Sequence, residues 1–199
     1  MTGFYRVVRA VAKPFVALLF RVKYIGTENI PSDGGIVLCC NHTSLTDVAF
    51  LAVSCKRQIF FMAKEELFRN KLLRWFFTKM GAFAVMRGKG DVGALEHAER
   101  IVSDGGVMGI FPEGKRILNS PPARAKTGAA VIVSRAQVPV VPASIYHEGG
   151  MKLFKRVTVR YGKPIMPSQL AFSDNSRSEI RRVSDTIMSE IIKLWELKH

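Results

Sequence analysis

Short, uninterrupted apolar runs recur along the chain, and segments with helical spacing separate them. An apolar run without polar alternation is typical of a strand that is covered on both faces of its sheet. Strands that alternate with helices indicate an α/β domain with a mostly parallel central sheet flanked by helices. We therefore expect strands at 23–25, 36–40, 59–62, 83–86, 107–111, 138–145 and 157–161. We expect helices at 47–55, 70–79, 92–103, 127–136 and 178–197.

The N-terminal segment, residues 1–22, is apolar apart from four interspersed basic residues. This mixture predicts an amphipathic helix that lies in a membrane interface, although a helix that packs on the domain remains an alternative. Pro14 is expected to kink or split that helix. The basic residues interrupt the apolar run before it reaches the roughly 18 residues that a spanning helix needs. No small-residue cleavage site follows a clean apolar stretch, which argues against a secretory signal. We expect one domain at 23–199 behind this segment.

The net charge of +14 predicts an anionic partner, such as a membrane surface, a phosphorylated substrate or nucleic acid. The basic residues concentrate at 56–89 and 111–135, within the body of the predicted fold, whereas a nucleic-acid-binding arm is more often a terminal block. The three cysteines have neither a disulfide framework nor zinc-site spacing, which favours a reducing compartment.

Polar and basic residues follow several of the predicted strands. In an open α/β sheet, ligands bind beyond the carboxyl ends of the strands. The segments at those ends contain His42 and Asp47, then Lys64, then Arg87, and then residues 113–116. We expect these groups to gather at one edge of the sheet. His147 also follows a predicted strand and is a minor candidate.

His42 and Asp47 are suited to general-base catalysis, because a carboxylate on one imidazole nitrogen fixes the tautomer and stabilises the cation that forms. Residues five apart on one helix do not share a face. The pair therefore requires His42 in the turn before a helix and Asp47 in the first turns of that helix. Asn41, Thr43 and Ser44 are suitable turn and cap residues. The alternative interpretation is a loop histidine beside an aspartate that caps the helix.

Residues 109–116 come close to a phosphate-binding P-loop, which requires Gly, four residues, Gly-Lys and then Ser or Thr. Arg116 stands where the magnesium-binding hydroxyl is needed, and Glu113 would place a carboxylate near the phosphates. The prolines at 121–122 leave little room for the required helix. We therefore exclude nucleotide hydrolysis and expect a strand end that presents Lys115 and Arg116 to an anion, with Glu113 free to hold a cation or a hydroxyl.

The chain resembles the glycerolipid acyltransferases, the 1-acylglycerol-3-phosphate acyltransferase family. Residues 41–47, Asn-His-Thr-Ser-Leu-Thr-Asp, resemble the NHxSxxD motif of that family. Residues 111–116, Phe-Pro-Glu-Gly-Lys-Arg, resemble its FPEGTR motif. Further blocks match in order and spacing, and they lie at 63–67, 81–87, 126–129 and 138–142.

The resemblance implies an O-acyltransferase. Such enzymes move a fatty acyl group from an acyl-CoA or acyl-ACP (acyl carrier protein) thioester to the free hydroxyl of 1-acyl-glycerol 3-phosphate, which gives phosphatidic acid. The resemblance makes His42 the general base and Asp47 the group that orients it and stabilises its charge. It implies no bound cofactor and no metal. The substrate-binding residues that it implies are Lys64, Arg87, Glu113, Gly114, Lys115, Arg116 and Lys126.

Lys115 departs from the family motif, because it replaces a threonine and adds charge beside the expected phosphate site. The acceptor therefore stays open, with glycerol 3-phosphate or another lysophospholipid as alternatives. A basic nucleic-acid-binding module and a catalytically silent lipid-binding protein are the remaining alternatives. The expected partners are the lysophospholipid, the thioester donor and a membrane surface, rather than nucleic acid. We expect a peripheral or monotopic protein at the cytoplasmic face of the cell membrane.

Overall fold

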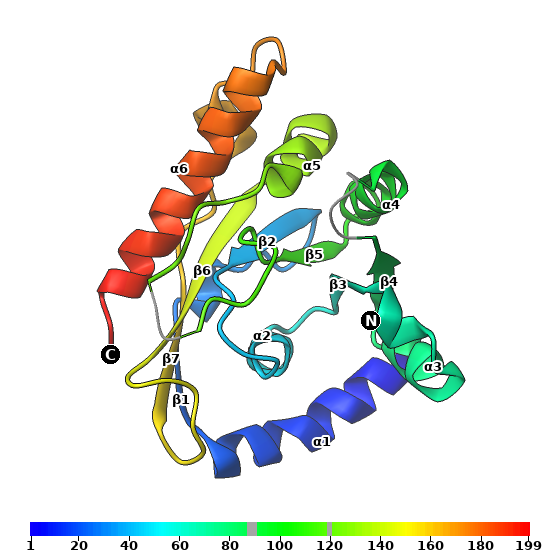
Figure 1. Cartoon of the computed structure of the whole chain (residues 1–199), viewed down its shortest axis with the longest axis vertical. Coiled ribbons are helices and arrows are strands. Elements are labelled where there is room, and N and C mark those ends of the chain that lie inside the picture. The colour runs from blue at the N-terminus through cyan, green and yellow to red at the C-terminus, as the bar shows by residue number, and fades with distance from the viewer. Residues whose placement is uncertain (87–90, 119–120) are drawn as a thin grey trace.

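The structure of the protein is a computed structural model that describes residues 1–86, 91–118 and 121–199 (Figure 1). The strands within these residues are β1 (Arg21–Ile25), β2 (Ile36–Cys40), β3 (Ile59–Lys64), β4 (Ala82–Val85), β5 (Val107–Ile110), β6 (Val140–His147) and β7 (Arg156–Tyr161). The helices are α1 (Gly3–Leu19), α2 (Asp47–Ser54), α3 (Lys71–Lys79), α4 (Val92–Ser103), α5 (Gly128–Ala136) and α6 (Arg177–Glu196).

The described strands form one sheet in the order β1-β7-β6-β2-β5-β3-β4. β2 lies at the centre and runs parallel to β5 and β6, while β3 runs parallel to β4 and β5. β7 is antiparallel to β6 and parallel to β1. The predicted α/β class with a mostly parallel sheet is therefore confirmed. The carboxyl ends of β2 to β6 meet at one edge, where ligands bind in open sheets of this kind.

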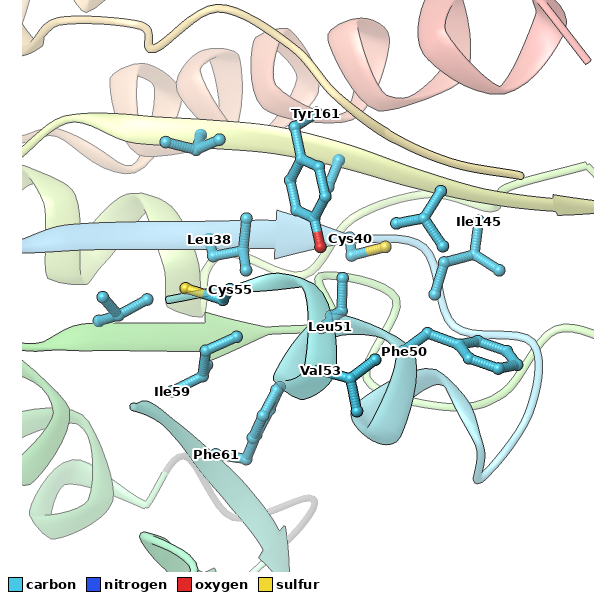
Figure 2. Packing of buried hydrophobic residues seen from close by; sticks show 14 of the residues in the cluster. Leu38, Cys40, Phe50, Leu51, Val53, Cys55, Ile59, Phe61, Ile145 and Tyr161 are labelled. Carbon is cyan, nitrogen blue, oxygen red and sulfur yellow. The ribbon is translucent and has the colours of Figure 1, made fainter. Parts of the chain in front are cut away.

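Helices cover both faces of the sheet, so there is a hydrophobic core on each face, and β2 contributes side chains to both cores. Its residues are fully buried along the whole strand. Because side chains alternate between the faces of a strand, Leu38 and Cys40 pack with α1 and α2, whereas Val37 and Cys39 pack with α4, α5 and α6. Figure 1 shows the two helical layers on opposite sides of the sheet. Figure 2 shows the first core, where Phe50 and Leu51 of α2 lie beneath β2.

α1 is one helix from Gly3 to Leu19, so Pro14 does not split it into two helices. Tertiary contacts compensate for the hydrogen bond that a proline removes from a helix. Tyr5 is buried and its hydroxyl accepts a hydrogen bond from the Ile59 backbone N–H, while Arg9 donates to carbonyls at the end of α2. Among the described residues, no helix is long and apolar enough to cross a bilayer.

Candidate active site

His42 and Asp47 form a hydrogen-bonded pair at the carboxyl end of β2. His42 lies in the turn after the strand, and Asp47 is the first residue of α2. His42 Nδ1 is 2.9 Å from Asp47 Oδ2, and the Asp47 side chain is fully buried. An ionised carboxylate only accepts hydrogen bonds, so Nδ1 carries the proton and Nε2 is the basic nitrogen. His42 also lines a pocket, so this pair has the geometry of an oriented general base.

The same carboxylate folds the turn that precedes α2. Asp47 Oδ2 accepts hydrogen bonds from the backbone N–H groups of Thr43, at 2.6 Å, and Ser44, at 2.8 Å. Thr43 Oγ1 also donates to Asp47 Oδ1 at 3.2 Å. The two sequence interpretations of Asp47 are therefore compatible, because one buried side chain both shapes the turn and orients the imidazole.

Asn41 fixes the start of this turn to the neighbouring strand β6. Its Nδ2 donates to the carbonyl oxygen of Ile145 at 3.0 Å, and its Oδ1 accepts from the Ile145 N–H at 2.8 Å. The Asn41 side-chain amide thus makes the two hydrogen bonds to β6 that a backbone peptide group would make, one residue beyond the end of β2. The sequence suggested Asn41 as a turn residue, but it gave no signal for this pairing across 104 positions.

Glu113 supports the backbone of His42 from the loop after β5. Its Oε2 accepts from the His42 N–H at 2.7 Å, and its Oε1 accepts from the Ala123 N–H at 2.8 Å. The His42 carbonyl in turn accepts from the Ile117 N–H at 2.7 Å. Glu113 is only 3% exposed, and this burial raises the pKa of its carboxyl above the ordinary value, although the two backbone donors oppose the shift. This geometry favours a positioning role, so direct binding of a glycerol phosphate by Glu113 stays a prediction.

Phe111 holds the other side of the imidazole. The rings of His42 and Phe111 are stacked, with centroids 4.0 Å apart and planes 17° from parallel. Phe111 itself stacks on Phe61 of β3, at a centroid distance of 5.8 Å. A stacked ring, together with the hydrogen bond at Nδ1, restricts rotation of the imidazole. Sequence reasoning noted Phe111 only as part of a motif and missed this contact.

A largely apolar pocket of about 420 Å³ opens from His42 between the sheet and the α4–α5 layer. Its apolar walls come from both helices and from the ends of β3, β4 and β5, and include Met62, Val85, Leu95, Ile110 and Val131. Lys126 and Gly114 also line it. Gly114 has φ of +67°, and a Cβ there would lie 2.8 Å from the side chain of Lys126, so only glycine fits without displacement.

The predicted basic residues do not form one cluster among the described residues. Lys126 lines the pocket that contains His42, whereas Arg116 lines a second pocket with Thr43 and Ser44. Lys64 is exposed and forms an ion pair with Glu66 at 3.0 Å. Lys115 is exposed next to Arg116. Arg87 lies outside the described residues. The binding roles of these residues stay predictions.

Comparisons with known proteins identify the family of the chain. A family model described as Acyltransferase matches residues 21–146. The 1-acyl-sn-glycerol-3-phosphate acyltransferase of Bacillus subtilis is 33% identical over 171 residues, which cover 84% of this chain and 85% of the relative. The Streptococcus pneumoniae protein of the same name is 30% identical over 182 residues, which cover 87% of this chain and 66% of that protein.

A solved structure has the same fold. It is the crystal structure of the 1-acyl-sn-glycerophosphate acyltransferase PlsC from Thermotoga maritima, with a TM-score of 0.75 and 26% sequence identity. The match covers 96% of this chain and 79% of that one. Because the family model spans well over half of the chain and the sequence relatives extend beyond it, the chain belongs to the acyltransferase family.

Proposed function

We propose that this protein transfers a fatty acyl group from an acyl thioester to the free hydroxyl of 1-acyl-glycerol 3-phosphate, which gives phosphatidic acid. The observation that carries the proposal is the buried Asp47 carboxylate 2.9 Å from Nδ1 of His42, which lines a largely apolar pocket. The relatives named as 1-acyl-sn-glycerol-3-phosphate acyltransferases support the choice of acceptor. Both acyl-CoA and acyl-ACP remain candidate donors.

In the proposed reaction, His42 Nε2 removes the proton from the acceptor hydroxyl as its oxygen attacks the thioester carbonyl. A C–O bond forms, and the carbonyl becomes a tetrahedral oxyanion. The C–S bond then breaks, and the proton on Nε2 passes to the leaving thiolate. Asp47 stabilises the imidazolium between these two proton transfers. General-base assistance of this kind is typically worth about 10²–10⁴ in rate.

The two substrates differ in what they need from the protein. A fatty acyl chain gains free energy when apolar walls exclude it from water, and the 420 Å³ pocket beside His42 offers such walls. A phosphate monoester carries nearly two negative charges and needs cations. We assign that role to Arg116, with Lys64, Arg87, Lys115 and Lys126 as further candidates from the family resemblance. Gly114 would leave room for the side chain of Lys126, and Glu113 would position the backbone of His42.

Access to lipid substrates requires a bilayer, and α1 is suited to lie on one. Val7, Val11, Phe15 and Leu18 recur at helical spacing and are each more than half exposed, while Tyr5 and Val16 on another side are buried in the domain. An exposed apolar stripe on a basic helix is typical of an interfacial helix. We therefore propose α1, within the expected segment 1–22, as a peripheral membrane segment at the cytoplasmic face of the cell membrane. The last two residues of that expected segment, Arg21 and Val22, instead begin β1, so the domain expected at 23–199 starts at the sheet.

The proposal is tested with purified wild type and His42→Ala, each incubated with lysophosphatidic acid in detergent micelles and with either acyl-CoA or acyl-ACP. Mass spectrometry follows the products. We expect phosphatidic acid from the wild type alone, with one donor or both. Equal product from both proteins would exclude His42 as the base. If neither protein forms phosphatidic acid, the acceptor assignment fails, and glycerol 3-phosphate and other lysophospholipids then show whether the chemistry survives with another acceptor.

A further inference from the structure

A second pocket, of about 280 Å³, lies beside the catalytic turn. Thr43 and Ser44, the two residues that follow His42, form one wall. Arg116 of the loop after β5 contributes a second wall. His147, at the end of β6, and Lys152, in the connection to β7, contribute the third. This connection, residues 148–155, is drawn in yellow at the lower left of Figure 1.

The two permanently cationic side chains of this pocket form no ion pair within the described part of the chain. Arg116 and Lys152 are exposed, and neither takes part in an ion pair between described residues. Both ring nitrogens of His147 are buried and have no hydrogen-bond partner among the described residues. A buried imidazole without a partner costs free energy that a bound acceptor would recover. The pocket therefore has the composition of an anion-binding site.

We propose that His147 and Lys152 join Arg116 in binding the phosphate group of the acceptor lipid. This inference rests on the proposed function, and it assigns a binding role to two residues that lie outside the family motifs. Arginine and lysine side chains together match the charge of a phosphate monoester. His147 adds a hydrogen-bond donor, because a neutral imidazole carries one ring N–H. Burial lowers the pKa of His147 below the ordinary value, although the nearby Asp47 carboxylate opposes the shift.

The reach of the substrates indicates which phosphate fits. In the acceptor, four bonds of about 1.5 Å separate the reacting hydroxyl oxygen from phosphorus, so the two atoms lie at most about 5 Å apart. Thr43 directly follows His42, and consecutive Cα atoms are about 3.8 Å apart, so the wall that contains Thr43 adjoins the catalytic histidine. In a pantetheine thioester, about a dozen bonds separate sulfur from the nearest phosphorus. A phosphate next to the catalytic turn is therefore that of the acceptor rather than that of the donor.

The test compares Lys152→Ala with the matched control Lys155→Ala, which removes an exposed lysine from the same connection outside the pocket. KM is measured for lysophosphatidic acid, for acyl-CoA and for acyl-pantetheine, which lacks the donor phosphates. We expect Lys152→Ala to raise the KM for lysophosphatidic acid roughly tenfold while both donor KM values stay unchanged. A rise in the KM for acyl-CoA alone, or no difference from Lys155→Ala, would overturn the proposal.

His147 is tested with His147→Leu and His147→Gln. The leucine variant removes the donor and should raise the acceptor KM, whereas the glutamine variant keeps a donor and should restore it. Equal KM values for both variants would contradict a hydrogen-bonding role. Calorimetric titration with glycerol 3-phosphate tests the pocket without turnover. If the wild type binds it no better than the Lys152→Ala/His147→Leu protein, the pocket assignment fails, even if phosphatidic acid is formed. If the wild type binds it but forms no phosphatidic acid, the proposed function fails alone.

Discussion

Replacing Asp47 by asparagine changes the charge of the catalytic pair with little change in shape. In the wild type, Asp47 Oδ2 receives hydrogen bonds from His42 Nδ1 at 2.9 Å, the Thr43 N–H at 2.6 Å and the Ser44 N–H at 2.8 Å. An asparagine amide offers one oxygen, which the two backbone donors of the turn would occupy. That oxygen would take the Oδ2 position, so the amide NH₂ group would take the Oδ1 position next to Thr43 Oγ1. The hydrogen bond from His42 Nδ1 can then persist, while the negative charge beside the imidazole is lost.

The expected loss of rate follows from the charge on Asp47. With about 4 Å between the centres of an imidazolium and a carboxylate, and an effective dielectric constant of about 20, the attraction is about 4 kcal/mol. The imidazolium forms only as the reaction proceeds, so this attraction stabilises the transition state more than the ground state. Since each 1.4 kcal/mol or so changes a rate tenfold, Asp47→Asn should lower kcat about a thousandfold.

The assay measures kcat and KM for phosphatidic acid formation with saturating donor, for wild type, Asp47→Asn and the control Asp33→Asn. Asp33 is exposed and its side chain makes no hydrogen bond among the described residues. Thermal unfolding followed by circular dichroism shows whether the variant is folded, because the weakened turn should also reduce the free energy of unfolding by about 2–3 kcal/mol. A folded Asp47→Asn protein whose kcat stays within tenfold of the wild type would refute the electrostatic role of Asp47.

Three further predictions concern Glu113, the apolar pocket and α1. Burial raises the pKa of Glu113 in the folded state, so its stabilising contribution is complete below the unfolded carboxyl pKa and is lost as pH rises through the folded pKa. Urea unfolding between about pH 4 and pH 8 should show the wild type losing stability relative to Glu113→Gln as pH rises, and parallel curves would contradict this. Val131→Phe places a larger ring in the pocket of His42, so product analysis with mixed donors should shift toward shorter acyl chains, whereas an unchanged distribution would mean that the chain lies elsewhere. Phe15→Ser should weaken binding to anionic vesicles about tenfold in a sedimentation assay, since burying a phenylalanine is worth roughly 1.5–3 kcal/mol, and a loss equal to that of the control Ala10→Ser would contradict a membrane-facing stripe.

The elements of this fold could be predicted closely from the sequence, because each has a local cause. The run at 36–40 is apolar at every position and forms β2 as expected. The expected helix at 92–103 begins after Asp91, whose side chain accepts a hydrogen bond from the Ala94 N–H. The expected strand at 138–145 starts later, at Val140, since Gln137 ends α5 in a left-handed conformation and Pro139 follows.

The order of the strands in the sheet could not be predicted from local sequence patterns. A mostly parallel sheet was predicted, but the antiparallel pairing of β7 with β6 depends on the connection at 148–155, where Gly149 and Gly150 take positive φ values. In the candidate active site, too, contacts within one segment could be predicted and contacts between distant segments could not. The pair His42–Asp47 lies within one loop and could be proposed from spacing, whereas the bond from the His42 N–H to Glu113 joins residues 71 positions apart. A motif shows that such residues belong together, but it does not show which atom of each takes part.

The strand order explains why these two motifs act on one residue. β2 and β5 are parallel neighbours, so the turn that contains His42 and the loop that contains Glu113 leave the same edge of the sheet side by side. The second loop then holds the His42 peptide at both its N–H, through Glu113, and its carbonyl, through the Ile117 N–H. Phe111 adds a contact to the ring itself. The histidine is therefore oriented by its own turn through Asp47 and placed by the neighbouring loop through its backbone. A change in that loop should thus lower kcat through the position of His42, even where the altered side chain never meets a substrate.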